Sequence, residues 1–425
     1  MLAWIIHTPL IVLLLLYLAK RSRHTPLKVY FWPAAIYKIL AGITLGLIYF
    51  YYYQHGDTLA INQELHAFSQ ICKENFSDYL NLLLSGETNN RYQALLNFYE
   101  QPRIHFFNRI ASPLFLFSLN NYWITATYLS IFSFAGFWYF GEIIYKIYKV
   151  DPLAIAIALL FMPGIALWTS GLLKESLVTS SLFFSTAIIL GYTEKLYPIR
   201  APKLILACML LFIAFHIKFY YTAVLLAVLP AYVISKKITG DNLTWKSLLP
   251  FLGFLITLLL ILSHSNAYLN ISTLAESIYN NYTATLQASG GSNIFIFENL
   301  QPTLSSMGKH SPQALFNGLF RPLPLDIHHW IAIPAAIENI FILTFTLTAL
   351  FAYYKNKPQL PAVVLPALAF VILSATLITL ASPNWGTLYR YKSPYMSVFL
   401  IMILNRNPLL LKIKQKLNYL WEQNH

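Results

Sequence analysis

The stretch that decides the fold is residues 202–235, which read PKLILACMLLFIAFHIKFYYTAVLLAVLPAYVIS. A helix that crosses a lipid bilayer needs about 20 mostly apolar residues. These roughly 34 residues are too many for one crossing. We therefore expect the chain to turn or break near His216–Lys218, so that two membrane helices lie side by side.

The composition of the whole chain agrees with a membrane setting. Of its 425 residues, 57% are hydrophobic and only 11% are charged, whereas soluble domains carry about 25% charged residues. A single water-soluble core of this size is implausible, and disordered chains are poor in apolar residues. The two cysteines, Cys72 and Cys208, also exclude a disulfide scaffold.

The hydropathy pattern predicts an all-α, multi-pass membrane protein with about eleven transmembrane helices. We interpret residues 1–425 as one integral membrane domain. The expected spans are 1–19, 31–53, 122–145, 152–170, 175–193, 202–216, 218–235, 247–264, 328–353, 360–381 and 387–405.

The distribution of charge predicts the orientation. Residues 1–19 lack a basic segment before the apolar run, so we interpret them as a retained span with the N-terminus outside and the C-terminus inside. With that topology the inner segments hold 18 Lys and Arg against five Asp and Glu, and the outer segments hold ten of each. The net charge of +13 is then a topology signal and not evidence for a nucleic-acid partner.

Two outer segments, 54–121 and 265–327, are too long to be simple connectors. The first contains amphipathic stretches at Leu80–Leu84 and Tyr92–Tyr99. We expect short helices there, lying on the membrane face.

Asp57 lies just outside the second expected span, in the triplet Gly56-Asp57-Thr58. An acid there is a candidate general base for a substrate lying along the membrane. The alternative is an ordinary helix N-cap, because Asp is a favoured capping residue. Glu64 is a weaker candidate for the same role.

Residues 163–176 read PGIALWTSGLLKES, a Pro- and Gly-interrupted apolar run followed by a charged pair. Adjacent helical residues point about 100° apart, so Lys174 and Glu175 should not simply neutralise each other. A helix that begins near Ser170 would offer free N–H groups which, with Lys174, favour an anion such as phosphate. The alternative is a hairpin with snorkelling charges.

Lys218 and Arg321 are two further candidates at the outer membrane edge. Lys218 lies among aromatic residues at the expected break, and Arg321 ends the second outer segment as a potential bidentate phosphate ligand. Either could instead be a snorkelling anchor. The adjacent His328 and His329 lack a spaced third ligand, so we predict no metal site.

The last candidate is Arg390-Tyr391-Lys392-Ser393-Pro394. A residue before proline favours extended geometry, in which residues i and i+2 face the same way. Arg390 and Lys392 would then point at one spot, or else serve as two anchors in an aromatic belt. Glu338, inside a span, should pair with a buried cation or accept hydrogen bonds from a neighbouring helix.

The outward-facing cations as a set suggest an anionic lipid headgroup as partner, best a lipid-linked phosphate or pyrophosphate. They are Arg103, Arg109, Lys174, Lys218, Arg321, Arg390 and Lys392. The sequence contains no P-loop, dinucleotide fingerprint, nucleophile elbow or zincin motif.

Three features together resemble a known family: the acid after an early span, W-x-S-G-x-x-K-E at Trp168–Glu175, and R-Y-K-x-P at Arg390–Pro394. They look like the GT-C superfamily of polyprenyl-phosphate-sugar glycosyltransferases, bacterial inner-membrane enzymes of cell-envelope polysaccharide biosynthesis. The resemblance implies an enzyme with a polyprenyl-phosphate-sugar donor and a glycan, lipid or protein acceptor at the outer face.

By motif position the resemblance makes Asp57 the base. It implies that Arg390 and Lys392 hold the leaving phosphate, assisted by Lys174, Glu175, Lys218 and Arg321 as further substrate-binding residues. Two other functions stay open: an O-antigen-type polysaccharide polymerase acting on polyprenyl-pyrophosphate-linked repeat units, and a transporter of lipid-linked glycans. The oligomeric state and the sugar are not predicted.

Overall fold

A computed structural model describes residues 2–22, 24–265, 271–290, 293–327 and 330–423. These residues form helices and turns, with two isolated β-bridges, so the all-α prediction is confirmed for the described part of the chain. The structure divides into two compact units, Met1–Thr222 and Ala223–His425. The expectation of one membrane domain stays a prediction.

The first unit contains, in chain order, α1 (Leu2–Arg21), η1 (Pro26–Tyr30), α2 (Phe31–Leu47), η2 (Ile48–Tyr53), α3 (Asp57–Glu74), α4 (Phe76–Ser85), α5 (Asn90–Gln93), α6 (Pro102–Phe117), α7 (Tyr122–Tyr148), α8 (Pro152–Ile155), η3 (Ala156–Phe161), α9 (Pro163–Trp168), α10 (Lys174–Thr193), α11 (Ala201–Ile217) and the start of α12 (Phe219–Thr239).

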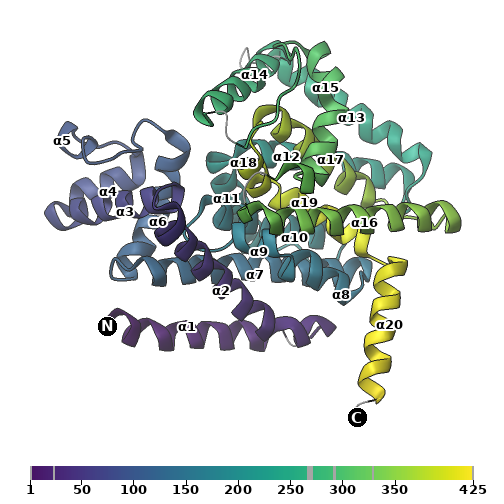
Figure 1. Cartoon of the computed structure of the whole chain (residues 1–425), viewed down its shortest axis with the longest axis horizontal. Coiled ribbons are helices and arrows are strands. Elements are labelled where there is room, and N and C mark those ends of the chain that lie inside the picture. Colours follow the sequence, from purple (N-terminus) through teal and green to yellow (C-terminus); the bar gives the residue numbers. More distant parts are fainter. Residues whose placement is uncertain (1, 23, 266–270, 291–292, 328–329, 424–425) are drawn as a thin grey trace. The chain divides into compact units, whose positions relative to one another are not determined.

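The core of the first unit is the contact between α7 and α10, with α2 against α7 and α11 against α10 (Figure 1). Gly136 of α7 permits this approach, because a Cβ there would lie 2.8 Å from the backbone oxygen of Ser180 in α10. The helix α1 contacts α2 and α7 but keeps most of its side chains exposed, as expected for a helix that faces lipid.

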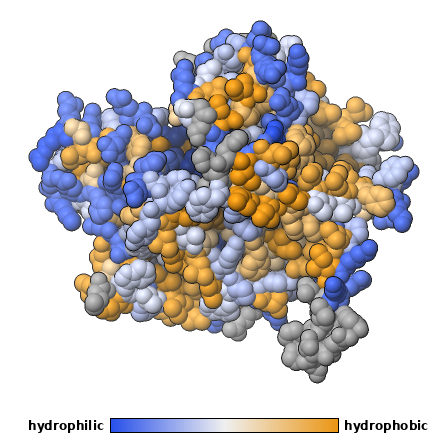
Figure 2. Space-filling model, in the orientation of Figure 1, coloured by the Kyte–Doolittle hydropathy of each residue, from blue (hydrophilic) through white to orange (hydrophobic). Residues whose placement is uncertain are grey.

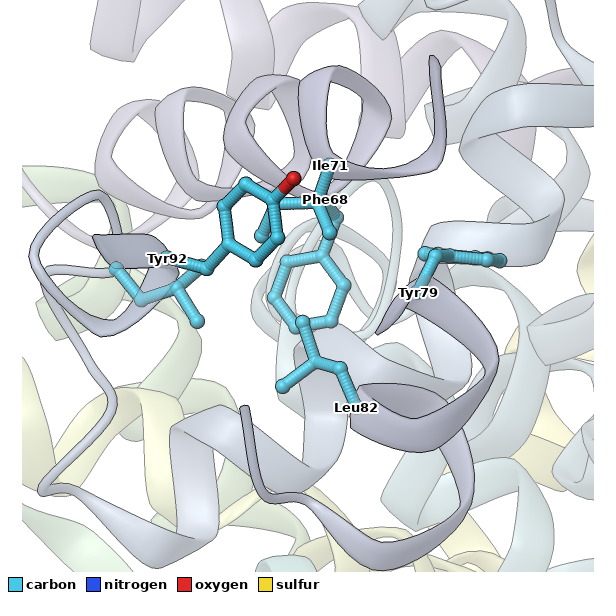
Figure 3. Close-up of a cluster of buried hydrophobic side chains, with 6 residues drawn as sticks. Phe68, Ile71, Tyr79, Leu82 and Tyr92 are labelled. Atoms are coloured by element: carbon cyan, nitrogen blue, oxygen red, sulfur yellow. The ribbon is translucent and has the colours of Figure 1, made fainter. Parts of the chain in front are cut away.

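The first outer segment forms a small helical subdomain with its own core. Asn75 caps α4 by accepting hydrogen bonds from the N–H groups of Ser77 and Asp78, and Gly86 ends it with φ of 86°. Phe68 of α3 points toward Leu82 of α4 (Figure 3). The remaining core residues are Ile71, Tyr79, Tyr92 and Leu96.

The prediction of short helices in this segment is confirmed for Leu80–Leu84, which lies within α4. It is only partly right for Tyr92–Tyr99, where α5 ends at Gln93 and turns follow. Hydrophilic residues cover much of the visible surface of α3–α5, at the left of the view, whereas hydrophobic residues are frequent on the other visible surfaces (Figure 2).

The second unit contains the rest of α12, followed by α13 (Trp245–Ser265), α14 (Ile271–Ala288), α15 (Leu304–Phe320), η5 (Pro324–Asp326), η6 (Trp330–Ala332), α16 (Ile333–Asn356), α17 (Val364–Ala381), α18 (Trp385–Tyr391), α19 (Ser393–Leu404) and α20 (Pro408–Gln423). The helix α17 packs against α14, α15 and α19. The second outer segment is therefore largely helical where it is described.

Six described helices are long and apolar enough to cross a bilayer, or seven if the bent pair α19–α20 is one span. This supports a multi-pass membrane protein, but the count of eleven is not confirmed. Two expected spans are not continuous helices: 152–170 is divided into α8, η3 and α9, and 387–405 into α18 and α19. Pro163 begins α9 at the first break, where its missing N–H is tolerated.

The expected break in residues 202–235 is confirmed. The helix α11 ends at Ile217, α12 begins at Phe219, and Lys218 between them has φ of −143° and ψ of 79°.

Candidate functional site

The connection between α9 and α10 is the structural centre of the candidate site in the first unit. Gly171 adopts φ of 71°, and its N–H donates to Ser130 Oγ of α7 at 2.9 Å. A Cβ on Gly42 of α2 would lie 2.9 Å from the Gly171 nitrogen, so glycine is needed where the two backbones meet. The connection is thus held inside the helix bundle, where Thr169, Ser170 and the following residues are buried.

The helix α10 begins at Lys174, not near Ser170 as the sequence suggested, because residues 169–173 make the glycine-containing connection. Lys174 Nζ lies 3.8 Å from Asp57 Oδ2. Glu175 Oε1 instead accepts a hydrogen bond from Lys218 Nζ at 2.7 Å. The adjacent charges therefore have different partners, as the 100° rotation per residue predicts.

Asp57 is the first residue of α3 and follows the N-cap Gly56, whose φ is 110°. The alternative prediction that Asp57 is itself the N-cap is wrong. Thr58 fixes this helix start, since its Oγ1 donates to the Leu172 carbonyl at 2.9 Å and lies 2.9 Å from the Tyr122 hydroxyl. The start of α3 is thereby tied to the α9–α10 connection, which places Asp57 beside Lys174.

The four charged side chains differ in their exposure to solvent. The side chain of Asp57 is 35% exposed and that of Lys174 is 10% exposed, whereas those of Glu175 and Lys218 are 2% and 6% exposed. Only Asp57 is substantially open to a molecule from outside. The pair Glu175–Lys218 holds the first turn of α10 against the α11–α12 break. The predicted substrate-binding roles of these two residues stay predictions.

Lys38 of α2 is a residue that the sequence reasoning did not select. Its side chain is buried, donates to Thr169 Oγ1 in the α9–α10 connection, and lies with Nζ 4.3 Å from the centre of the Phe137 ring. An ionisable residue inside an apolar span is a functional candidate by default. That signal was present in the sequence, as a single lysine in residues 31–53.

Glu64 is not available as a substitute base. It is fully buried and accepts hydrogen bonds from the N–H groups of Asn97 at 2.8 Å and Phe98 at 3.4 Å. Burial raises the pKa of the Glu64 carboxyl, and the two backbone N–H groups oppose that shift. Its role is to hold the turn that follows α5.

Two of the predicted outward-facing cations belong to the first outer segment. The Arg109 guanidinium donates to the carbonyls of Leu83 and Leu84, so it completes the end of α4. Arg103 is exposed and lies over the Phe219 ring at 5.1 Å.

Arg321, in the second unit, is paired with an acid. Its Nε donates to Asp326 Oδ2 at 2.8 Å, and its NH2 contacts the other carboxylate oxygen. The guanidinium carbon lies 5.0 Å from the Trp385 ring centre. The bidentate geometry predicted for phosphate is thus occupied by the carboxylate of η5 in this structure.

Lys392 is buried at 2% exposure. Its Nζ donates to Asn339 Oδ1 of α16 at 2.6 Å and to the Arg321 carbonyl at 3.4 Å. Asn339 in turn donates to the Pro322 carbonyl at 2.8 Å. Lys392 therefore connects the start of α19 to α16 and the end of α15.

The prediction that Arg390 and Lys392 lie in an extended segment and face one spot is wrong. Asn384 caps α18 by accepting a hydrogen bond from Thr387 N–H, and Pro394 occupies the first turn of α19. The backbone at Lys392 is helical, with φ of −76° and ψ of −10°, and helical residues two apart do not share a face. Arg390, half-buried, lies over the Tyr391 ring at 5.0 Å.

Glu338 of α16 accepts a hydrogen bond from the Tyr389 hydroxyl at 2.9 Å. This is one of the two arrangements expected for a carboxylate inside a span, a hydrogen bond from a neighbouring helix.

Within the described ranges, no group of three His, Cys, Asp or Glu side chains could hold a metal ion. His328 and His329 lie outside those ranges. Compared with known proteins, the chain matches no family model, no curated protein and no solved structure.

The structure thus brings four of the seven candidate site residues into one cluster in the first unit: Asp57, Lys174, Glu175 and Lys218. The other three, Arg321, Arg390 and Lys392, belong to the second unit, where Lys392 contacts the Arg321 carbonyl. Their roles as phosphate ligands stay predictions.

Proposed function

We propose that this protein is a membrane glycosyltransferase that moves a sugar from a polyprenyl-phosphate donor to an acceptor hydroxyl at the outer membrane face. The observation that supports it is the pair Asp57–Lys174: a partly exposed carboxylate 3.8 Å from a mostly buried ammonium. A base and a cation at one membrane edge are the two groups that such a transfer requires.

In this proposal Asp57 accepts the proton of the acceptor hydroxyl as its oxygen attacks the anomeric carbon of the donor sugar. The bond from that carbon to the phosphate oxygen breaks, and the electron pair leaves with the polyprenyl phosphate. Lys174 stabilises the negative charge that grows on this phosphate, because a fixed cation in a low-dielectric site is already oriented. Glu175 and Lys218 hold the first turn of α10, and with it Lys174, in position.

The test compares surface glycans of a deletion strain that expresses the wild-type chain, Asp57→Asn or Glu87→Gln. Glu87 is an exposed acid of the same outer segment and serves as the matched control. We expect Asp57→Asn to accumulate in the membrane at the wild-type level while its glycan lacks one sugar, a loss of transfer of about 100-fold or more. Glu87→Gln should restore the full glycan. Wild-type glycan in the Asp57→Asn strain would remove the base from the proposal.

A second function, transport of a lipid-linked glycan, is favoured by the non-helical connection between α9 and α10, which lies inside the bundle and is followed by the buried Lys174 and Glu175. Transporters build substrate sites from such discontinuous helices. The same deletion distinguishes the two functions. A transporter defect leaves undecorated lipid-linked intermediates on the cytoplasmic leaflet, whereas a transferase defect leaves an exported glycan with one sugar missing.

A further inference from the structure

Between α19 and α20 the chain makes a sharp corner that is held by side-chain hydrogen bonds. Arg406 adopts a left-handed conformation with φ of 57°, and Pro408 begins α20. Between them, the Asn407 amide donates to the carbonyls of Phe345 in α16 at 3.0 Å and Ile403 at 2.8 Å. The axes of α19 and α20 differ by 73° as a result.

Asn407 also determines how α20 begins. Its Oδ1 accepts the N–H of Leu409 at 2.9 Å, which satisfies one of the free donors of the first helical turn. Asn407 is only 2% exposed. A buried polar side chain with its hydrogen bonds made fixes one geometry, so the direction of α20 relative to α16 and α19 is set by the fold.

The residues after the corner form an amphipathic, basic helix. Leu410 is buried, with 5% of its surface exposed. Ile413 lies one turn later on the same face and is 42% exposed. Gln415 lies on the opposite face, and the exposed Lys412 and Lys416 lie between the two faces; Leu411, one turn before Gln415, is exposed as well, at 41%. In the sequence the apolar spacing continues with Leu417, Leu420 and Trp421.

The charge of this segment is mostly positive, with one acid, Glu422, near its end. Between Arg406 and Trp421 the sequence contains Lys412, Lys414 and Lys416 and no Asp or Glu. Clusters of lysine beside a membrane helix attract anionic lipid headgroups. Crossing the hydrocarbon would instead bury several lysines at a cost of about 2.5 kcal/mol or more each near the bilayer centre.

We propose that α20 lies in the membrane–water interface as an in-plane helix, with Ile413 toward the acyl chains and Lys412 and Lys416 toward anionic lipid headgroups. The corner at Asn407 fixes the direction in which α20 leaves α19, and the lysines of α20 attract the negative charge of the headgroups. This inference is independent of the transferase proposal, because neither Asp57 nor Lys174 takes part in it.

The test uses the full-length protein in nanodiscs, with Cys72 and Cys208 replaced by serine and one spin label at position 413 or 415. The label's collision rates with oxygen, which enters lipid, and with a nickel chelate, which stays in water, report its depth. In nanodiscs with phosphatidylglycerol we expect protection of Ile413→Cys from nickel and access of nickel to Gln415→Cys. With phosphatidylcholine alone this contrast should shrink.

Four results would overturn the inference. Nickel access at both positions in anionic nanodiscs means that α20 is in water, and protection at both means that it crosses the bilayer. An equal contrast in both lipids means that headgroup charge is not recognised. The variant Lys412→Gln/Lys416→Gln should lose the dependence of the nickel contrast on anionic lipid. The control Lys355→Gln/Lys357→Gln changes two exposed lysines at the end of α16 and should keep that dependence. An equal loss in the control also contradicts the inference.

Discussion

The buried pair Glu175–Lys218 allows a quantitative prediction. Glu175→Gln removes the carboxylate oxygen that lies 2.7 Å from Lys218 Nζ, at a place where both side chains are less than 7% exposed. At an effective dielectric of 20 the attraction across that distance is about 6 kcal/mol, offset in the native protein by the cost of desolvating both charges. Removal of one partner leaves that cost uncompensated, so the free energy of unfolding should fall by about 3–5 kcal/mol.

The double variant Glu175→Gln/Lys218→Met should recover most of this loss, because no buried charge of the pair then remains. We expect a coupling free energy of about 3 kcal/mol from the double-mutant cycle. The assay is equilibrium unfolding in mixed micelles, followed by circular dichroism. The pair Arg91–Glu74 is the matched control, since its atoms are 2.9 Å apart but Arg91 is 76% exposed; its cycle should give coupling near zero.

The reasoning is refuted if the double variant is as unstable as the sum of the single variants. Equal coupling in the buried and exposed cycles would also refute it, because burial would then not determine the strength of the pair.

Two further predictions concern packing and pH. Gly136→Ala places a Cβ 2.7 Å from Ser180 Cβ and should lower the free energy of unfolding by about 1–3 kcal/mol in the same assay. The control Gly253→Ala has open space around it and should be neutral or slightly stabilising. Equal effects of the two substitutions would contradict close packing of α7 on α10. Burial lowers the pKa of the His105 imidazole. The Gly86 carbonyl oxygen, 3.1 Å from Nε2, opposes this shift, and the nearby Arg109 adds to it. The unfolded chain then binds the proton more readily, so stability present above pH 6.5 is lost as the pH falls below that value. His105→Gln should flatten this part of a stability–pH profile, and an unchanged slope would contradict the assignment.

The sequence predicted the helices better than their interruptions. Apolar runs such as 175–193 and 360–381 indicate segments that leave water, whether for lipid or for the protein interior, and hydropathy reports that preference. The break within 387–405 depends on where backbone groups find partners, such as the Asn384 side chain for Thr387 N–H, and the connection after α9 depends on Ser130 Oγ for Gly171 N–H. Hydropathy does not contain that information.

For the candidate site, the sequence indicated which charges matter but not which ones meet. The divergence of Lys174 and Glu175 follows from helical geometry and was predictable. Their partners were not, because Lys218 and Asp57 are distant in the sequence. The extended geometry expected at Arg390–Lys392 failed because Asn384 caps a helix there and proline is accepted in a first turn.

The pair Glu175–Lys218 also has a consequence for biosynthesis. The chain is made from its N-terminus, so Glu175 leaves the ribosome 43 residues before its counter-ion Lys218. If α10 entered the bilayer alone, it would do so with an unneutralised acid in its first turn, which is unfavourable in lipid. Insertion of α10, α11 and the beginning of α12 as one group avoids that state, so the order of membrane entry is coupled to this single contact.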